Sequence, residues 1–79
     1  MEMIEERIKR AITSVIAVED NEFDLNASLA GDFNADSFDL VKIAMNIEDE
    51  FKIEIPPDDM VNFTTVREVR DYIAAKLKE

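Results

Sequence analysis

Apolar residues recur every three or four positions in three stretches of the chain, which is the period of a helix with one buried face. This pattern predicts a first helix over residues 2–17, a second over residues 37–51 and a last one over residues 66–78. The apolar positions that define the first and last helices are Ile4, Ile8, Ala11, Ile12, Val15 and Ile16, and Val66, Val69, Ile73 and Leu77.

The stretch between the first two helices has a different pattern. Residues 18–36 show no helical period, although Phe23, Leu25, Leu29 and Phe33 are spaced along them. Loops of this length are uncommon in small domains and often lie beside functional sites. We therefore expect these apolar side chains to hold the loop against the helices.

Two prolines interrupt the chain after the second helix. Pro56 and Pro57 stop the helix, and Pro57 followed by acidic residues suits the first turn of a short third helix. Thr65 and Glu68 have the spacing of a capping box at the start of the last helix. The sequence thus predicts an all-α fold, a small four-helix bundle with a long first loop and a short third helix, in a single domain over residues 1–79.

The helix over residues 37–51 has two apolar stripes, because a helix turns by about 100° per residue. The larger stripe predicts the face that packs into the core, and it consists of Leu40, Ile43, Ala44, Ile47 and Phe51. The smaller stripe lies more than a quarter-turn away and consists of Phe38, Val41 and Met45, with Glu48 and Asp49 on either side. This second stripe is either a contact surface for another protein or a surface that a neighbouring helix covers.

Negative charge is concentrated in the middle of the chain. The net charge is −10, and residues 11–66 hold 13 acidic residues against two basic ones, Lys42 and Lys52. Such a surface repels nucleic acid and attracts basic proteins, or it serves solubility alone. Cysteine and histidine are absent, which excludes thiol redox chemistry, disulfides, thiolate metal sites and the commonest general base.

The chain shows no targeting or membrane signal. No stretch approaches the roughly 20 apolar residues of a membrane-spanning helix, and the first residues lack the apolar stretch of a secretory signal. We therefore expect a cytoplasmic protein, or its equivalent in a plastid stroma or mitochondrial matrix, that acts as a monomer and has no membrane span.

One serine has a position that suits modification. Ser37 lies where the long loop meets the second helix, in Asp36-Ser37-Phe38-Asp39. A hydroxyl at a helix start is exposed, and a phosphate ester there gains hydrogen bonds from backbone N–H groups and a favourable helix dipole. Serine in this position also commonly serves only as a helix cap. From the residues alone, both interpretations stay open.

The acidic residues of the loop do not form a calcium-binding loop. Asp32, Asn34 and Asp36 match the first three ligand positions of an EF-hand, but Ser37 and Ile43 replace the Gly and Glu that the motif requires. No pair of carboxylates stands out for hydrolytic chemistry. We therefore expect no catalytic residue and no dedicated metal site, and only diffuse binding of divalent cations to the acidic surface.

Around Ser37 the chain resembles the acyl carrier protein family, whose usual signature is Gly-Ala-Asp-Ser-Leu. The resemblance continues in the same order through nearly the whole chain, and this combination is far more specific than an Asp-Ser pair. The matching segments are Ile4-Glu5-Glu6-Arg7, Glu48-Asp49-Glu50-Phe51, Glu54-Ile55-Pro56, Thr64-Thr65-Val66 and Asp71-Tyr72-Ile73.

The resemblance implies that Ser37 accepts phosphopantetheine from coenzyme A, added by a separate phosphopantetheinyl transferase, so that the chain is a carrier and not an enzyme. The thiol of this arm would hold acyl groups as thioesters for enzymes of fatty-acid, lipid or polyketide biosynthesis. The implied partner face would meet the basic faces of acyl synthases, reductases or acyltransferases. It consists of the acids Asp36, Asp39, Glu48 and Asp49 and the apolar residues Phe38, Val41 and Met45. The implied acyl pocket consists of Ile47, Phe51, Ile55, Met60 and Val61.

Three residues depart from the family pattern. Phe38 replaces the Leu that follows the serine, Asn34 stands where Gly is usual, and Lys42 stands where the family has an acid. Asn also adopts a left-handed backbone, so we expect the turn to be kept. Lys42 removes negative charge from the recognition face, which fits a specialised carrier at least as well as a housekeeping one. The alternatives are an unmodified acidic adaptor that binds proteins through its second helix, and a carrier for an aminoacyl group.

Overall fold

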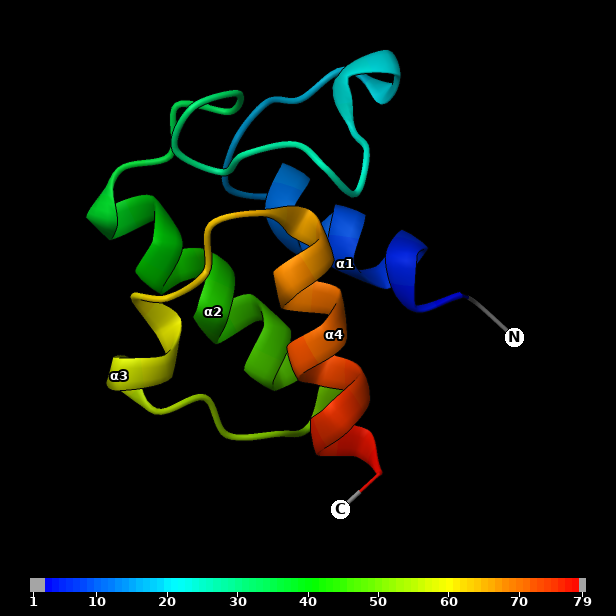
Figure 1. Ribbon diagram of the computed structural model, residues 1–79, viewed down its shortest axis with the longest axis vertical. Helices are drawn as coiled ribbons and strands as arrows, with labels where there is room; N and C mark the ends of the chain where they lie inside the picture. The colour runs from blue at the N-terminus through cyan, green and yellow to red at the C-terminus, as the bar shows by residue number, and fades with distance from the viewer. Residues whose placement is uncertain (1–2, 79) are drawn as a thin grey trace.

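Four α-helices and one 3-10 turn form the fold in the computed structural model, which describes residues 3–78. The elements are α1 (Ile4–Thr13), the 3-10 turn η1 (Asp20–Glu22), α2 (Ser37–Phe51), α3 (Pro57–Met60) and α4 (Val66–Leu77). Figure 1 shows α1, α2 and α4 packed together, α3 beside α2, and the long connection arching over one end of the bundle. The predicted all-α bundle with a long first loop and a short third helix is confirmed.

The core lies between α1, α2 and α4. Each of these helices contributes the apolar face that its sequence period predicts, except that Leu77 of α4 is exposed. Full burial of an Ile, Leu or Val side chain contributes about 1.5–3 kcal/mol to stability. The largest fully buried side chains are Ile8, Ile12, Leu29, Ile43, Ile47, Val66, Val69 and Ile73.

α2 and α4 begin with matching caps. Asp36 Oδ1 accepts a hydrogen bond from the Asp39 N–H, and the Asp39 carboxylate accepts one from the Asp36 N–H. Thr65 and Glu68 form the same reciprocal pair at the start of α4, as their spacing predicts. Pro57 opens α3, also as predicted. Such caps satisfy N–H groups that a helix start leaves without partners, and each contributes about 1 kcal/mol.

α1 is shorter than predicted, because it ends at Thr13 and not four residues later. The carbonyl oxygen of Ala11 accepts hydrogen bonds from Asn46 Nδ2 (3.2 Å) and from Ser14 Oγ (3.1 Å). The N–H of Val15, which an α-helix would direct to Ala11, bonds instead to the residue three positions before it. The regular α-helical hydrogen bonding is therefore broken at Val15, where a side chain from α2 bonds to its acceptor, although the Ile16 N–H still donates to the Ile12 carbonyl (3.0 Å).

The other helix ends lie close to the predicted positions. α2 has the predicted bounds and ends at Lys52 in a left-handed conformation with φ of 56°. α4 ends at Leu77, one residue early. The prediction that Leu77 is buried is wrong, since its side chain is 46% exposed. In Figure 1 the last turn of α4 extends past the end of α2.

The long connection between α1 and α2 is held by the segment at the start of α4. The Leu29 N–H donates to the Thr64 carbonyl (2.9 Å), and the Val66 N–H donates to the Ala27 carbonyl (3.1 Å). The apolar side chains predicted to hold the loop are buried or half-buried against the core, namely Phe23, Leu25, Leu29 and Phe33. The loop therefore leads to the start of α2 along a fixed path.

Candidate functional site

Ser37 is the first residue of α2, and its side chain is exposed. Asp36 caps the helix, so the interpretation of Ser37 as a cap is wrong, and its hydroxyl has no hydrogen-bond partner within residues 3–78. The other two serines are engaged: Ser14 Oγ donates to the Ala11 carbonyl, and Ser28 Oγ accepts from a backbone N–H. An external enzyme can therefore modify Ser37 without breaking a structural contact.

The turn before α2 sets the position of Ser37. Asn34 has φ of 58°, so the left-handed backbone predicted there is confirmed. On either side of it, Phe33 and Ala35 are buried, and the Ala35 N–H donates to the Leu29 carbonyl (2.9 Å). The buried residues on both sides of the turn fix the chain, and the next residues emerge into solvent as the cap and the first residue of α2.

The smaller apolar stripe of α2 faces solvent. Phe38 is 76% exposed, Val41 40% and Met45 58%. The alternative that a neighbouring helix covers this stripe is therefore wrong for residues 3–78. We call Phe38, Val41 and Met45, with the charged residues beside them, the outer face of α2.

The four acids predicted for the outer face differ in their surroundings. Asp36 and Asp39 bond to each other's backbone in the α2 cap. Glu48 Oε2 accepts a hydrogen bond from the Ile55 N–H (2.9 Å) and ties the connection after α2 back to the helix. Asp49 is exposed. All four carboxylates lie on or beside α2, but three of them also stabilise the fold.

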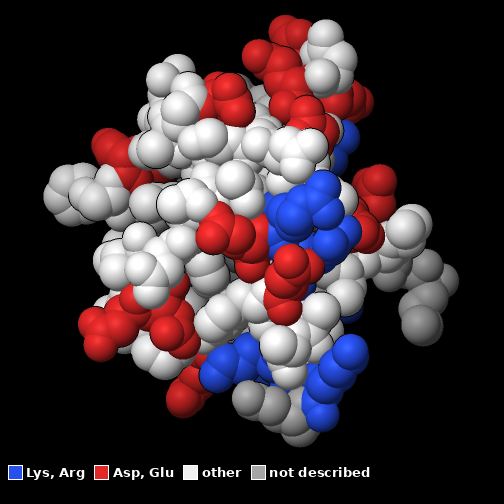
Figure 2. Space-filling model, viewed as in Figure 1, with Lys and Arg blue, Asp and Glu red and all other residues white. Residues whose placement is uncertain are grey.

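Charge is unevenly distributed over the surface. In Figure 2, acidic atoms lie over the long connection, the start of α2 and α3, whereas basic atoms lie along α4 and its end with acidic atoms between them. Lys42 and Lys52, the two basic residues of the acidic middle section, are both exposed. Within the described range 3–78, no group of three or more acids is placed to hold a metal ion. In the same range, no helix has the length and apolar content needed to cross a membrane.

The residues predicted for an acyl pocket are not all inside the bundle. Ile47, Phe51 and Ile55 are buried in the core and Met60 is half-buried, but Val61 is 72% exposed. Val61 is exposed because α3 has a single turn that ends just before it. The chain turns there and directs the next apolar residue, Phe63, into the core. The sequence analysis did not single out Phe63.

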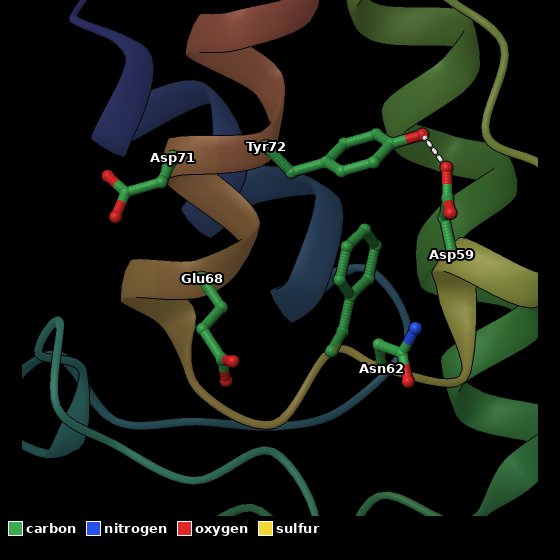
Figure 3. Close-up of a pocket in the computed structure, with 6 residues that line it drawn as sticks. Asp59, Asn62, Glu68, Asp71 and Tyr72 are labelled. Atoms are coloured by element: carbon green, nitrogen blue, oxygen red, sulfur yellow. Dashed lines mark hydrogen bonds between the residues drawn. The ribbon is translucent and has the colours of Figure 1, made fainter.

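A groove of about 290 Å³ lies between α3 and α4. Figure 3 shows Tyr72 extending from α4 toward α3, where its hydroxyl donates to Asp59 Oδ2 (2.7 Å). The Tyr72 ring packs edge-on against Phe63, with ring centroids 5.2 Å apart. The residues that line the groove are Asp59, Asn62, Phe63, Glu68, Asp71 and Tyr72. No periodic signal marks them, since they come from three neighbouring segments.

Comparison with known proteins identifies the class of site. A family model described as the phosphopantetheine attachment site matches residues 6–73. The fold is similar to the solution structure of "a putative acyl carrier protein from Anaplasma phagocytophilum", with a TM-score of 0.82 and 31% identity over 95% of this chain and 89% of that chain. An exposed hydroxyl without an internal partner fits the covalent group that the family carries. Its members are carriers that separate enzymes modify, and they are not catalysts. The chain belongs to the phosphopantetheine-attachment family, with an acyl carrier role and covalently attached phosphopantetheine as its cofactor.

Proposed function

We propose that Ser37 is the attachment residue and that the chain delivers acyl groups, held as thioesters, to enzymes of fatty-acid, lipid or polyketide biosynthesis. One observation carries the choice of residue. The Ser37 hydroxyl is exposed and has no partner within residues 3–78, whereas Ser14 and Ser28 are both engaged in hydrogen bonds.

Attachment is a group transfer that a separate transferase catalyses. The Ser37 oxygen bonds to the phosphorus of the phosphopantetheine half of coenzyme A, the pyrophosphate bond breaks, and adenosine bisphosphate leaves. The hydroxyl proton passes to a base of the transferase. The resulting phosphodiester lies at the N-terminal end of α2, where the helix dipole stabilises its negative charge. The thiol of the arm supplies the thioester chemistry that a chain without cysteine lacks.

The outer face of α2 is the surface that partners would bind. Its centre is apolar and exposed, and Phe38 is its largest and most exposed side chain. Exposed aromatic residues of this kind commonly anchor protein interfaces. The acids around it, Asp36, Asp39, Glu48 and Asp49, would attract and orient a basic partner surface.

A carried acyl chain would be sheltered between α2, α3 and α4. Ile47, Phe51, Ile55 and Met60 offer the apolar lining, and Val61 lies outside it. These side chains pack against one another in the unloaded protein, and protein interiors are too dense to admit a further chain without movement. A covering element must therefore move when cargo enters.

Intact-mass measurement tests the attachment residue. After incubation with coenzyme A and a promiscuous phosphopantetheinyl transferase, the parent protein should gain one phosphopantetheine. A Ser14→Ala control should gain the same mass, and Ser37→Ala should gain none. A parent protein that stays unmodified would overturn the proposal and leave an acidic adaptor that binds proteins through α2.

The carried acyl group can be identified on the protein purified from its native cells. Fatty-acyl or polyketide thioesters on the arm support the proposed class of pathway. Aminoacyl thioesters would replace it with the alternative of an amino-acid carrier.

A further inference from the structure

α3 is the least firmly anchored helix of the bundle. It has a single turn and, unlike α1, α2 and α4, it contributes no buried residue. The backbone N–H groups of residues 59–63 donate to carbonyl oxygens of residues 56–60. These bonds hold the turn together but do not fasten it to another helix, so its attachment depends on side chains.

Tyr72 provides such an attachment from α4. Its hydroxyl donates to Asp59 Oδ2 at 2.7 Å, in a partly buried position. Its ring packs against Phe63, which is 7% exposed and belongs to the core. Figure 3 shows the ring crossing the groove so that its hydroxyl reaches α3. A hydrogen bond to a charged acceptor is stronger than one between neutral groups, more so when water is partly excluded.

We propose that the Tyr72–Asp59 hydrogen bond is a latch that holds α3 closed over the interior and thereby controls how readily a carried acyl chain enters. This inference rests on the proposed carrier function. Ile47, Phe51 and Ile55 lie in the closed core, so a chain enters when a covering element moves. α3 is the one α-helix without a buried residue within residues 3–78, and Tyr72 joins it to the core through Phe63.

The latch predicts a direction of effect. The hydrogen bond exists when α3 is closed and is broken when α3 opens to admit cargo. Removing it therefore shifts the population toward the open and the cargo-filled states. For a partly exposed hydrogen bond of this kind, the expected shift in the equilibrium is about three- to tenfold.

Amide hydrogen exchange on the unmodified protein tests the latch itself. Tyr72→Phe removes the hydroxyl and keeps the ring against Phe63. We expect the amides of residues 60–63 to exchange about three- to tenfold faster in Tyr72→Phe, while amides in α1 and in the middle of α2 keep their rates. Asp59→Ala should act in the same way. Asp58→Ala is the matched control, because Asp58 is an exposed acid on the same turn.

Two results would overturn the latch. One is that the amides of residues 60–63 exchange at the same rate in Tyr72→Phe as in the parent protein. The other is an equal acceleration in Asp58→Ala and Asp59→Ala, which would show that the charge near the start of α3 matters and the hydrogen bond does not. Unchanged exchange in α1 and α2 shows that each variant is folded.

A thioester cleavage assay on the modified protein tests the control of cargo. Hydroxylamine should cleave an octanoyl thioester about threefold or more slowly in Tyr72→Phe than in the parent, since the chain spends more time inside. An acetyl thioester, which is too short to reach the interior, should be cleaved equally in both. Equal octanoyl rates would overturn the latch as a control of cargo and leave the carrier function intact. Failure of Ser37 to accept the arm would instead overturn the carrier function, and the exchange experiment does not depend on that step.

Discussion

The guanidinium of Arg7 holds Glu50 at two points, with Nε 2.7 Å from Oε2 and Nη2 2.8 Å from the backbone carbonyl oxygen. The same guanidinium lies 4.3 Å from the centre of the Phe51 ring. A carbonyl in the last turn of a helix lacks a partner within that helix, and the negative C-terminal end of the helix dipole favours a cation. Arg7 therefore fastens α1 to the end of α2, beside a residue proposed to shelter cargo.

Arg7→Lys should destabilise the fold although it keeps the charge. A lysine cannot reproduce the two-point contact, and both side chains are about one-third exposed (31% and 33%). We expect the free energy of unfolding in urea to fall by about 1–2 kcal/mol. Arg10→Lys is the control, because the Arg10 guanidinium is 3.7 Å from the same carboxylate and 55% exposed. Its free energy of unfolding should therefore fall by much less. Equal losses in the two variants would contradict this role of Arg7.

Asp20 should contribute stability that depends on pH. Lys9 Nζ lies 2.5 Å from Asp20 Oδ1. The hydrogen bond from Lys9, with its charge, lowers the pKa of Asp20, and the hydrogen bond to Asp20 raises the pKa of Lys9. The Asp20 contribution is therefore present above the pKa of the unfolded chain and is lost as pH falls through the lower folded value. The Lys9 contribution is complete below its unfolded pKa and is lost as pH rises through the higher folded value.

The corresponding experiment compares Asp20→Asn with the parent in urea at several pH values. The variant should be slightly less stable at pH 7, because Asp20 is 91% exposed and solvent screens the pair. The difference should shrink as the solution is acidified below the folded pKa of Asp20. Glu54→Gln, at another exposed carboxylate, serves as the control. A stability difference for Asp20→Asn that stays constant down to acid pH would show that the ion pair is not its source.

Lys42→Glu should tighten binding to a generic fatty-acid synthase partner. Lys42 is exposed on α2, has no ion-pair partner within residues 3–78, and reduces the negative charge of the face proposed to meet a basic surface. Reversing its charge should lower Kd by a few-fold at low salt, mainly through faster association. Lys78→Glu makes the same charge change at the end of α4 and should have little effect. Weakened or unchanged binding for Lys42→Glu would show that our interpretation of the outer face is incorrect.

Cations should raise the melting temperature. Residues 11–66 carry 13 acids and two lysines over a small core, and this self-repulsion is screened by salt. We expect Tm to fall when salt is lowered or magnesium is removed, as measured by circular dichroism. Sodium chloride at matched ionic strength separates magnesium binding from general screening. A Tm that does not respond to magnesium would count against cation binding on the acidic surface.

Local features of the chain predict α2 and α4 well. The bounds of α2 are correct because its apolar period, the acids at its start and the prolines after it all agree. The start of α4 is correct because Thr65 and Glu68 form a cap within a few residues. Asn34 adopts its left-handed turn for a reason that is also local.

Contacts between distant residues account for the features that the sequence did not predict. α1 ends early because Asn46, 35 positions from Ala11 in the sequence, bonds to its carbonyl. Val61 faces solvent because the turn after α3 brings Phe63 inward in its place. Tyr72 and Asp59 are 13 positions apart on different helices, so no period or short motif links them.

The sequence by itself determined the helical periods, the place of Ser37 at the start of α2 and the second apolar stripe on that helix, since spacing and local chemistry are enough for these. Only the tertiary structure decided that the Ser37 hydroxyl has no partner within residues 3–78 and that the second apolar stripe of α2 is uncovered. It also decided that the Tyr72 hydroxyl bonds to Asp59. These features depend on which distant side chains meet and which surfaces water reaches, and the packing of the helices sets both.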